Sequence, residues 1–305
     1  MSSLHHRSPV PVLAAVLFIG LLTSTSASAQ WVTLDRFDGT VKANVSTSFI
    51  VGSEPTDSSD LVSHTDIFLQ AGYADWGGYI QAPMIASGSR GRYEFGNIEI
   101  GALYNFALPM LSVTLHGGVA LPTMPSLETC PKDGDPNSRG CLLSQFHNDA
   151  GWARLTDTPL LVANSITNRF GASIRIPMGV LHARADVGVD ILFPLEESRD
   201  PVDDLELFFR ANVGIGAKYL LFGGTFEWSI FQAIRDQSVA RDDTEFAHSI
   251  AFSLRLHTKY VQPFIAGHLP LQKSVIGDIG VITMGLTSSF IIDSSRLVPL
   301  PRMVP

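Results

Sequence analysis

Charged side chains that alternate with apolar ones are the feature of this sequence with the clearest chemical meaning. In residues 181–193 every odd position is apolar, whereas the even positions include His182, Arg184, Asp186 and Asp190. Such alternation predicts a β-strand with one apolar and one polar face. The pattern runs beyond the roughly 9–11 residues that a tilted strand needs to cross a bilayer. On a strand that lines a channel, charges of both signs could sort solutes.

The same pattern recurs along the chain, and its polar face carries the candidate lumen-lining residues. These candidates are the ionisable side chains Glu99, His116, Arg169, Arg175, His182, Arg184, Asp186, Asp190, Arg210, Glu227 and Arg255. Two roles are open for them. They line an open or gated lumen and set its local field, or they pair with one another and fill a plugged interior. Both signs occur in similar number, so a strong ion preference is not implied.

About twelve alternating segments, within a range of ten to fourteen, position these residues. They lie at 41–51, 66–73, 78–85, 97–106, 112–121, 169–176, 181–193, 205–219, 222–230, 246–257, 262–271 and 279–292. Connections that follow odd-numbered segments tend to be long and polar, whereas those that follow even-numbered segments are short. Strands can span hydrocarbon only when the sheet closes and leaves no edge. The sequence therefore predicts an all-β fold, a closed antiparallel transmembrane β-barrel with long loops on one side and short turns on the other.

The first residues predict export. Residues 9–22 form an apolar run after Arg7, and residues 23–29 are small and end in an A-x-A pattern, so we expect a signal peptide at residues 1–29. The apolar run is shorter than the roughly 18–20 residues of a spanning helix. The barrel then comprises residues 30–305, with a short tail at 293–305. A net charge of −8 and no basic patch argue against nucleic-acid binding.

The longest predicted loop, residues 122–159, contains both cysteines of the chain. In an exported protein Cys130 and Cys141 are expected to form a disulfide that closes this loop. Asp133 and Asp135 have the spacing that begins a calcium loop, but no suitably placed Glu completes it and a proline interrupts it. A solvated, disulfide-closed loop is therefore favoured, and no metal or cofactor is predicted, although calcium stays open as an alternative.

An enzyme is the alternative from another class, because His248 and Ser249 beside Asp242 and Asp243 could supply a base, a nucleophile and an acid. The alternation places His248 and Ser249 on opposite faces of one strand, however, and the two aspartates in a charged loop. Catalysis is therefore not expected. Loss of a hydrolase activity in Ser249→Ala would be needed to support it.

Taken together, the signal peptide, the alternating strands and the unequal loops resemble the outer-membrane β-barrel proteins of Gram-negative bacteria. The resemblance covers the whole mature chain. Residues 261–267, with Leu-Pro or Ile-Pro repeated at strand ends, are similar to transporter-like barrels, including those associated with aromatic-compound degradation. The resemblance to outer-membrane barrels implies an outer-membrane location, contact with lipid and lipopolysaccharide, and insertion by the barrel assembly machinery. The Pro-rich tail departs from the family's usual aromatic ending.

The prediction that follows is a passive channel or transporter for small solutes with a mixed-charge, porin-like lumen. A structural or adhesive barrel with a plugged interior is the alternative, and an outer-membrane lipid hydrolase or protease ranks third. The pattern sets no oligomeric state.

Overall fold

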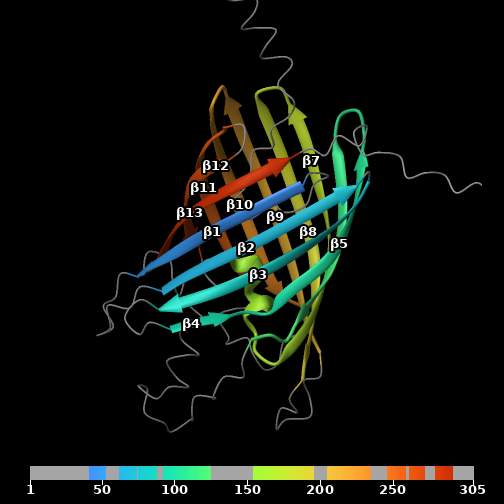
Figure 1. Ribbon diagram of the computed structural model, residues 1–305, viewed down its shortest axis with the longest axis vertical. Coiled ribbons are helices and arrows are strands. Elements are labelled where there is room, and N and C mark those ends of the chain that lie inside the picture. The colour runs from blue at the N-terminus through green and yellow to red at the C-terminus, as the bar shows by residue number, and fades with distance from the viewer. Residues whose placement is uncertain are drawn as a thin grey trace, which may run out of the picture.

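Strands form nearly all of the regular structure in the computed structural model (Figure 1). It describes residues 41–52, 62–73, 75–87, 92–124, 154–195, 205–234, 246–258, 261–271 and 279–290. The strands are β1 (Val41–Gly52), β2 (Val62–Tyr73), β3 (Trp76–Ser87), β4 (Arg92–Phe95), β5 (Ile98–Ala107), β6 (Ser112–Leu121), β7 (Ser165–Met178), β8 (Leu181–Pro194), β9 (Glu206–Tyr219), β10 (Phe222–Ala233), β11 (Phe246–Leu256), β12 (Gln262–Pro270) and β13 (Ile279–Phe290). A short 3-10 helix, η1 (Leu155–Leu161), precedes β7.

Twelve of these strands close into one antiparallel barrel. Successive barrel strands pair with one another, and β1 also pairs with β13, from Val41 opposite Phe290 to Gly52 opposite Ile279. The extra strand, β4, pairs with the far end of β3. Closure removes the free edges of the sheet, which is the condition for strands in hydrocarbon. The predicted closed antiparallel barrel of about twelve strands is thus confirmed.

The two ends of the barrel differ. At one end tight turns join the strands: residues 179–180 connect β7 to β8 and residues 220–221 connect β9 to β10. Both turns need a positive φ, which is 70° at Gly179 and 54° at Leu220. At the other end β6 and β7 are separated by residues 122–164. We call these the short-turn end, uppermost in Figure 1, and the long-connection end.

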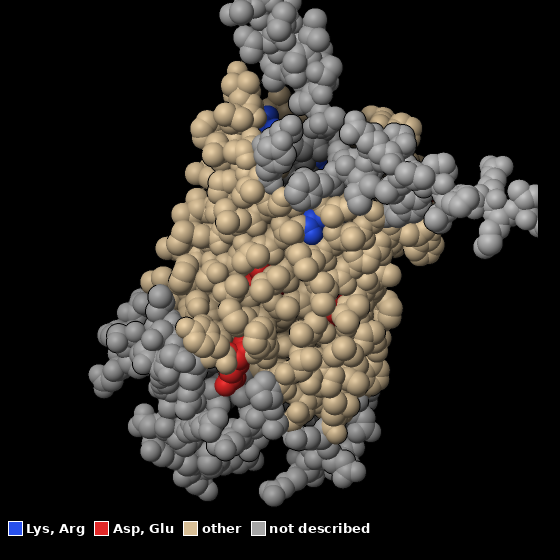
Figure 2. Space-filling model, in the orientation of Figure 1, with Lys and Arg blue, Asp and Glu red and all other residues tan. Residues whose placement is uncertain are grey.

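The wall has an apolar outside and a polar inside. On β8 the outward Val187 is 47% exposed, whereas the inward Asp186 next to it is 4% exposed. The same contrast recurs around the barrel, and the outer surface in Figure 2 shows few charged atoms. A soluble protein buries its apolar side chains, so this reversed arrangement fits a wall that faces lipid.

A β-bulge interrupts the wall between β4 and β5. Three steps along β3, from Gln81 to Met84, face four steps from Phe95 to Glu99, so one residue is extra. The bulge lies opposite Pro83, which has no N–H for the ladder but accepts a hydrogen bond from the Gly96 N–H at 2.8 Å. A Cβ at position 96 would lie 2.8 Å from the Leu160 carbonyl oxygen, so only glycine fits this close approach.

The helix η1 lies inside the barrel, towards the long-connection end (Figure 1). At one end of the helix, Leu155 packs with Phe231 and Ala247 of β10 and β11. At the other end, Leu161 joins a buried cluster from β1, β2, β3 and β13. We call residues 154–161 the plug, because their contacts reach from one side of the wall to the other. Within the described ranges no helix is long and apolar enough to cross a membrane.

Candidate functional site

The candidate lumen-lining residues all lie on inward faces of the barrel strands. Those buried below a tenth of their surface are Glu99, His116, Arg169, His182, Arg184, Asp186, Asp190, Arg210, Glu227 and Arg255, and Arg175 is half-buried. The structure divides them between two levels of the lumen. Near mid-wall they meet the plug in a network of ion pairs, and near the short-turn end the basic members gather.

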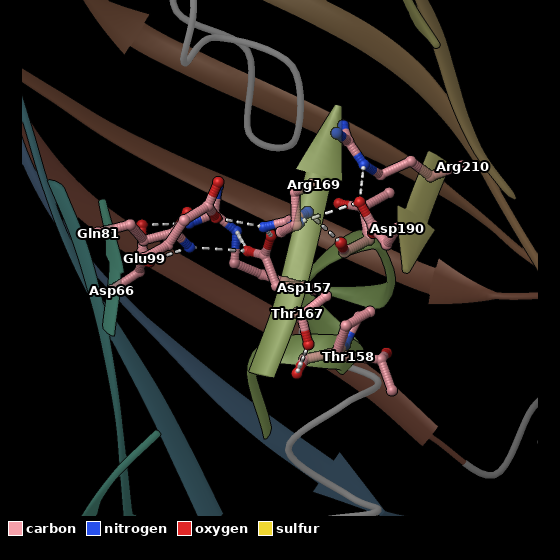
Figure 3. A network of polar contacts seen from close by, with 12 residues as sticks. Asp66, Gln81, Glu99, Asp157, Thr158, Thr167, Arg169, Asp190 and Arg210 are labelled. Carbon is pink, nitrogen blue, oxygen red and sulfur yellow. Dashed lines mark hydrogen bonds and ion pairs between the residues drawn. The ribbon is translucent and has the colours of Figure 1, made fainter. Parts of the chain in front are cut away.

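Arg169 on β7 is the centre of the mid-wall network (Figure 3). Its Nη1 lies 2.7 Å from Glu99 Oε2 on β5 and 3.6 Å from Asp157 Oδ1 in the plug. Its Nε lies 3.2 Å from Asp190 Oδ1 on β8, and its Nη2 donates to the Thr156 carbonyl at 2.8 Å. One guanidinium therefore links two strands of the wall to the plug, using the several donors that arginine holds in a planar fork.

Arg210 on β9 extends this network around the wall. Its Nε lies 3.0 Å from Asp190 Oδ1 and its Nη1 3.1 Å from Asp186 Oδ1. The guanidinium lies over Gly188, where a Cβ would approach its Cζ to 2.5 Å. Asp186 also contacts His116 Nε2 at 3.3 Å and accepts a hydrogen bond from the Ser173 hydroxyl. The carboxylates are thus bridged in series by two arginines.

Arg154 fastens the plug to the opposite side of the network. Its Nη1 donates to Asp66 Oδ2 on β2 at 2.6 Å, and its Nε lies 3.3 Å from Asp157 Oδ2. Gln81 donates to both carboxylates, at 2.8 Å to Asp66 and 3.4 Å to Asp157. Burial alone would lower the pKa of Arg154, but the two carboxylates outweigh it and raise that pKa, so the side chain stays charged.

The bulge supplies the neutral contacts of the plug. The backbone N–H of Asn97 donates to the Leu160 carbonyl at 2.7 Å. Its side-chain amide donates to the Val162 carbonyl at 2.7 Å and accepts from the Met124 N–H at 3.1 Å. Both charged and neutral groups therefore attach the plug to the wall. We call the mid-wall network the ionic layer; its members are Asp66, Glu99, Arg154, Asp157, Arg169, Asp186, Asp190, Arg210 and Glu227.

The inward cations of the short-turn end form a second level, which we call the basic rim. It consists of Lys42, Arg175, Arg184, Lys218 and Arg255, with His182 and His257 beside them. Each of the five cations lies within three residues of the end of its strand: Arg175 lies three before Met178, and Lys218 directly precedes Tyr219. Asp186 and Asp190 lie deeper, five or more residues from the start of β8 at Leu181.

The opposite part of the wall, from β10 through β13 to β1, is lined mainly by hydroxyl and amide groups. Ser48 and Thr283 share a hydrogen bond at 2.8 Å, and the Thr287 hydroxyl donates to Asn44 Oδ1 at 3.0 Å. Thr225 and Ser253 are also hydrogen-bonded. These neutral groups are paired across neighbouring strands, as is usual for buried polar side chains.

The structure separates the residues of the considered hydrolase site. Ser249 is buried on the inward face of β11, whereas His248 lies on the other face, opposite Ile230 of β10. Asp242, Asp243, Cys130, Cys141, Asp133 and Asp135 lie outside the described residues, as do the predicted signal peptide and tail. Among the described residues, no group of three or more His, Cys, Asp or Glu side chains could hold a metal ion.

Among solved structures, the fold is similar to that of the NanC porin, with a TM-score of 0.53, 10% identity, and coverage of 81% of this chain and 100% of the porin. It is likewise similar to an outer membrane channel from Pseudomonas putida F1, with a TM-score of 0.53, 10% identity, and coverage of 87% of this chain and 98% of that channel. No family model and no curated protein matches the chain. The protein thus has the fold of an outer-membrane β-barrel, and at this identity the likeness concerns the fold alone.

Sequence reasoning did not single out several members of the two levels. Asp66, Lys42 and Lys218 lie on the polar face that the alternation identified, so their positions were readable from the pattern. Arg154 and Asp157 were not, because they belong to a short segment without periodicity inside a long connection. The register between strands, which the sequence does not show, brings Arg169 to Glu99 across 70 residues.

Proposed function

We propose that the protein is a passive outer-membrane channel for small solutes, in which the plug narrows a polar lumen. The observation that carries this proposal is the reversed polarity of the wall, apolar outside and charged inside, around a segment that is not part of the wall. A barrel that served only as a membrane anchor would not need charged groups at every level of its interior. The fold shared with the NanC porin supports the same reading.

The attachment of the plug favours a gated channel. The plug is held by two guanidinium-centred ion pairs, Arg154 to Asp66 and Arg169 to Asp157, and by the hydrogen bond from the Asn97 N–H to the Leu160 carbonyl. Such contacts can be exchanged for water without opening the wall, because the strand ladder does not pass through the plug. Displacement of the plug would therefore widen the lumen while leaving the barrel intact.

A structural or adhesive barrel is the second candidate, and the depth of burial favours it. Glu99, Asp190 and Glu227 face the lumen yet are at most 1% exposed. Apolar clusters also anchor both ends of η1. In this alternative the ionic layer and the plug permanently fill the interior, as side chains do in small barrels.

Conductance across a planar lipid bilayer distinguishes the two candidates. We expect stepwise openings from the refolded protein, and larger steps from Arg154→Gln, in which the tether to Asp66 is lost. Thr158→Ala is the matched control, because it changes the plug but leaves both ion pairs of Arg154 in place. Electrical silence of the native chain and of Arg154→Gln, in barrels shown to be folded, would favour the structural barrel instead.

The same proposal also indicates which partners the protein would have. The outward apolar side chains would contact the lipid and lipopolysaccharide of the outer membrane, after export by a signal peptide at residues 1–29 and insertion by the barrel assembly machinery. His248 and Ser249 lie on opposite faces of β11, which disfavours a hydrolase in which these two side chains act together.

A further inference from the structure

The charge of the lumen changes sign along the barrel axis. In the ionic layer the carboxylates are Asp66, Glu99, Asp157, Asp186, Asp190 and Glu227, and the guanidiniums are Arg154, Arg169 and Arg210. The basic rim has only cations: among the lumen-facing residues described there, none is Asp or Glu.

Two arginines of the rim face each other directly. Arg175 of β7 is the register partner of Arg184 of β8. Side chains in that relation have their Cβ atoms about 4.5–5.5 Å apart, and like charges so placed repel. Arg184 is only 3% exposed, so solvent screens this repulsion less than it would at a surface. An anionic group between the two guanidiniums would turn the repulsion into attraction.

The other rim cations surround this pair. Lys218 extends from β9, Arg255 from β11 and Lys42 from β1, so positive charge reaches the lumen from five of the twelve barrel strands. The ring of Phe264 lies 4.7 Å from the Arg255 guanidinium and fixes it by a cation–π contact. Lys42, Arg175, Arg184 and Arg255 each make further polar or electrostatic contacts. The rim is therefore distinguished by the sign of its charge and not by a lack of partners.

We propose that the basic rim binds small solutes that carry two or more anionic groups, carboxylate or phosphate, on the short-turn side of the plug. The guanidinium fork matches both groups in geometry and charge. Several cations converging from different strands favour a multivalent anion over a monovalent one. This inference rests on the proposed function, because the solute must reach the rim through an open short-turn mouth.

The ionic layer gives the bound anion a barrier on its far side. Carboxylates outnumber guanidiniums in the ionic layer. The negative potential of the layer therefore opposes the further passage of an anion that the rim has attracted. The rim is then a holding site at the entrance and not a uniform anion filter. We expect anions added at the short-turn side to block current more strongly than anions added at the other side.

Calorimetric titration of citrate into the refolded barrel in detergent tests binding without requiring conduction. We expect the double variant Arg175→Gln with Arg184→Gln to bind citrate at least about 10-fold more weakly, since two charged hydrogen-bonding partners are lost. The matched control, Arg175→Lys with Arg184→Lys, keeps both charges but loses the guanidinium forks, and it should bind citrate more tightly than the double Gln variant. If the double Gln variant does not fold, Arg175→Gln alone serves, because that side chain is only half-buried.

Two further probes test whether the rim recognises anionic groups and not small polar solutes in general. Inorganic phosphate should compete with citrate, and glucose should not. Absence of citrate binding to the native barrel, or equal binding by the native and double Gln variants, would overturn the inference.

Conductance measurements on the same proteins separate this inference from the proposed function. Citrate binding in a barrel that never conducts would keep the rim site and overturn the channel. A conducting barrel that neither binds citrate nor is blocked by it would keep the channel and overturn the rim site.

Discussion

The ionic layer and the basic rim share one lumen but solve the problem of buried charge in opposite ways. In the layer each guanidinium lies against carboxylates, as Arg169 does against Glu99 and Asp190. In the rim Arg175 faces Arg184, and neighbouring strands add further cations. The strand residues of both levels are placed inward by the same alternation.

The difference separates charge that holds the structure from charge that acts on a ligand. Burying an ion costs several kcal/mol unless opposite charge and hydrogen bonds compensate, and the layer provides this compensation internally. The rim gathers like charges instead, so an anionic solute can supply part of the opposite charge that compensates their burial. Stability should therefore depend on the layer, and solute preference should depend on the rim.

Removal of Arg169 should have the largest effect on stability. Arg169→Gln leaves Glu99, Asp157 and Asp190 without their shared guanidinium, which should lower the free energy of unfolding by about 3–5 kcal/mol. Urea unfolding from lipid vesicles measures this loss. Arg175→Gln is the matched control from the rim, and an equal loss there would remove the distinction between the two levels.

A charge on the outer wall should be nearly as costly. Val187→Arg places a guanidinium in the lipid at the depth of the layer, next to Asp186, which should cost about 2–4 kcal/mol. Band shift of unheated samples on a gel, together with urea unfolding, reports the loss of folded barrel. Val187→Leu keeps the apolar face and should fold normally. A well-tolerated arginine would mean that this face does not contact lipid.

Loss of the Asp66 carboxylate should weaken the plug more than the barrel. Asp66→Asn removes the shorter of the two ion pairs of Arg154, and a lost charged hydrogen bond costs about 1–3 kcal/mol. We expect a larger conductance step with little change in barrel unfolding. The double variant with Arg154→Gln should add little beyond Arg154→Gln alone, because that change already removes the ion pair with Asp66. Full additivity would show that Asp66 acts through another partner.

Substitution of Arg184 should have the smallest effect on stability. Arg184→Gln relieves the repulsion with Arg175, so unfolding should change by less than about 1 kcal/mol, in the direction of greater stability. Arg184→Lys, which keeps the charge, should leave the unfolding curve in place. A loss comparable to that of Arg169→Gln would assign Arg184 to the structural level.

The barrel itself was readable from the sequence because period-two alternation and closure leave few alternatives. The positions of Lys42 and Lys218 at strand ends also followed from the pattern, and their distance from the short turns indicates their level in the lumen. The wall near Pro83 is less readable: Gly96 and Asn97 interrupt the alternation, and no predicted segment covers β4. The sequence has no local signal for a bulge whose role is to contact a segment about 60 residues away.

The plug and the pairing within the ionic layer could not be predicted for a related reason. Leu155–Leu161 is too short to show helical periodicity and contains Pro159. Its burial results from contacts with strands that are distant in sequence, such as the packing of Leu161 with Val281 and Ile50. Likewise, whether Arg169 meets Glu99 or another carboxylate depends on the stagger of the strands, which is a property of the closed barrel.

The reach of the plug across the lumen leads us to expect an order of events in folding. Its two apolar anchors lie on separate parts of the wall, one on β10 and β11 and the other on a cluster completed by β13 and β1. The second anchor includes Val281 of β13 and Ile50 of β1, so we expect the plug to dock fully only after these two strands pair. In that order Arg169 and its carboxylates would stay hydrated until the plug docks, and we expect their dehydration to be a late step. A probe on the plug would therefore report completion of the barrel, after the strands have already formed.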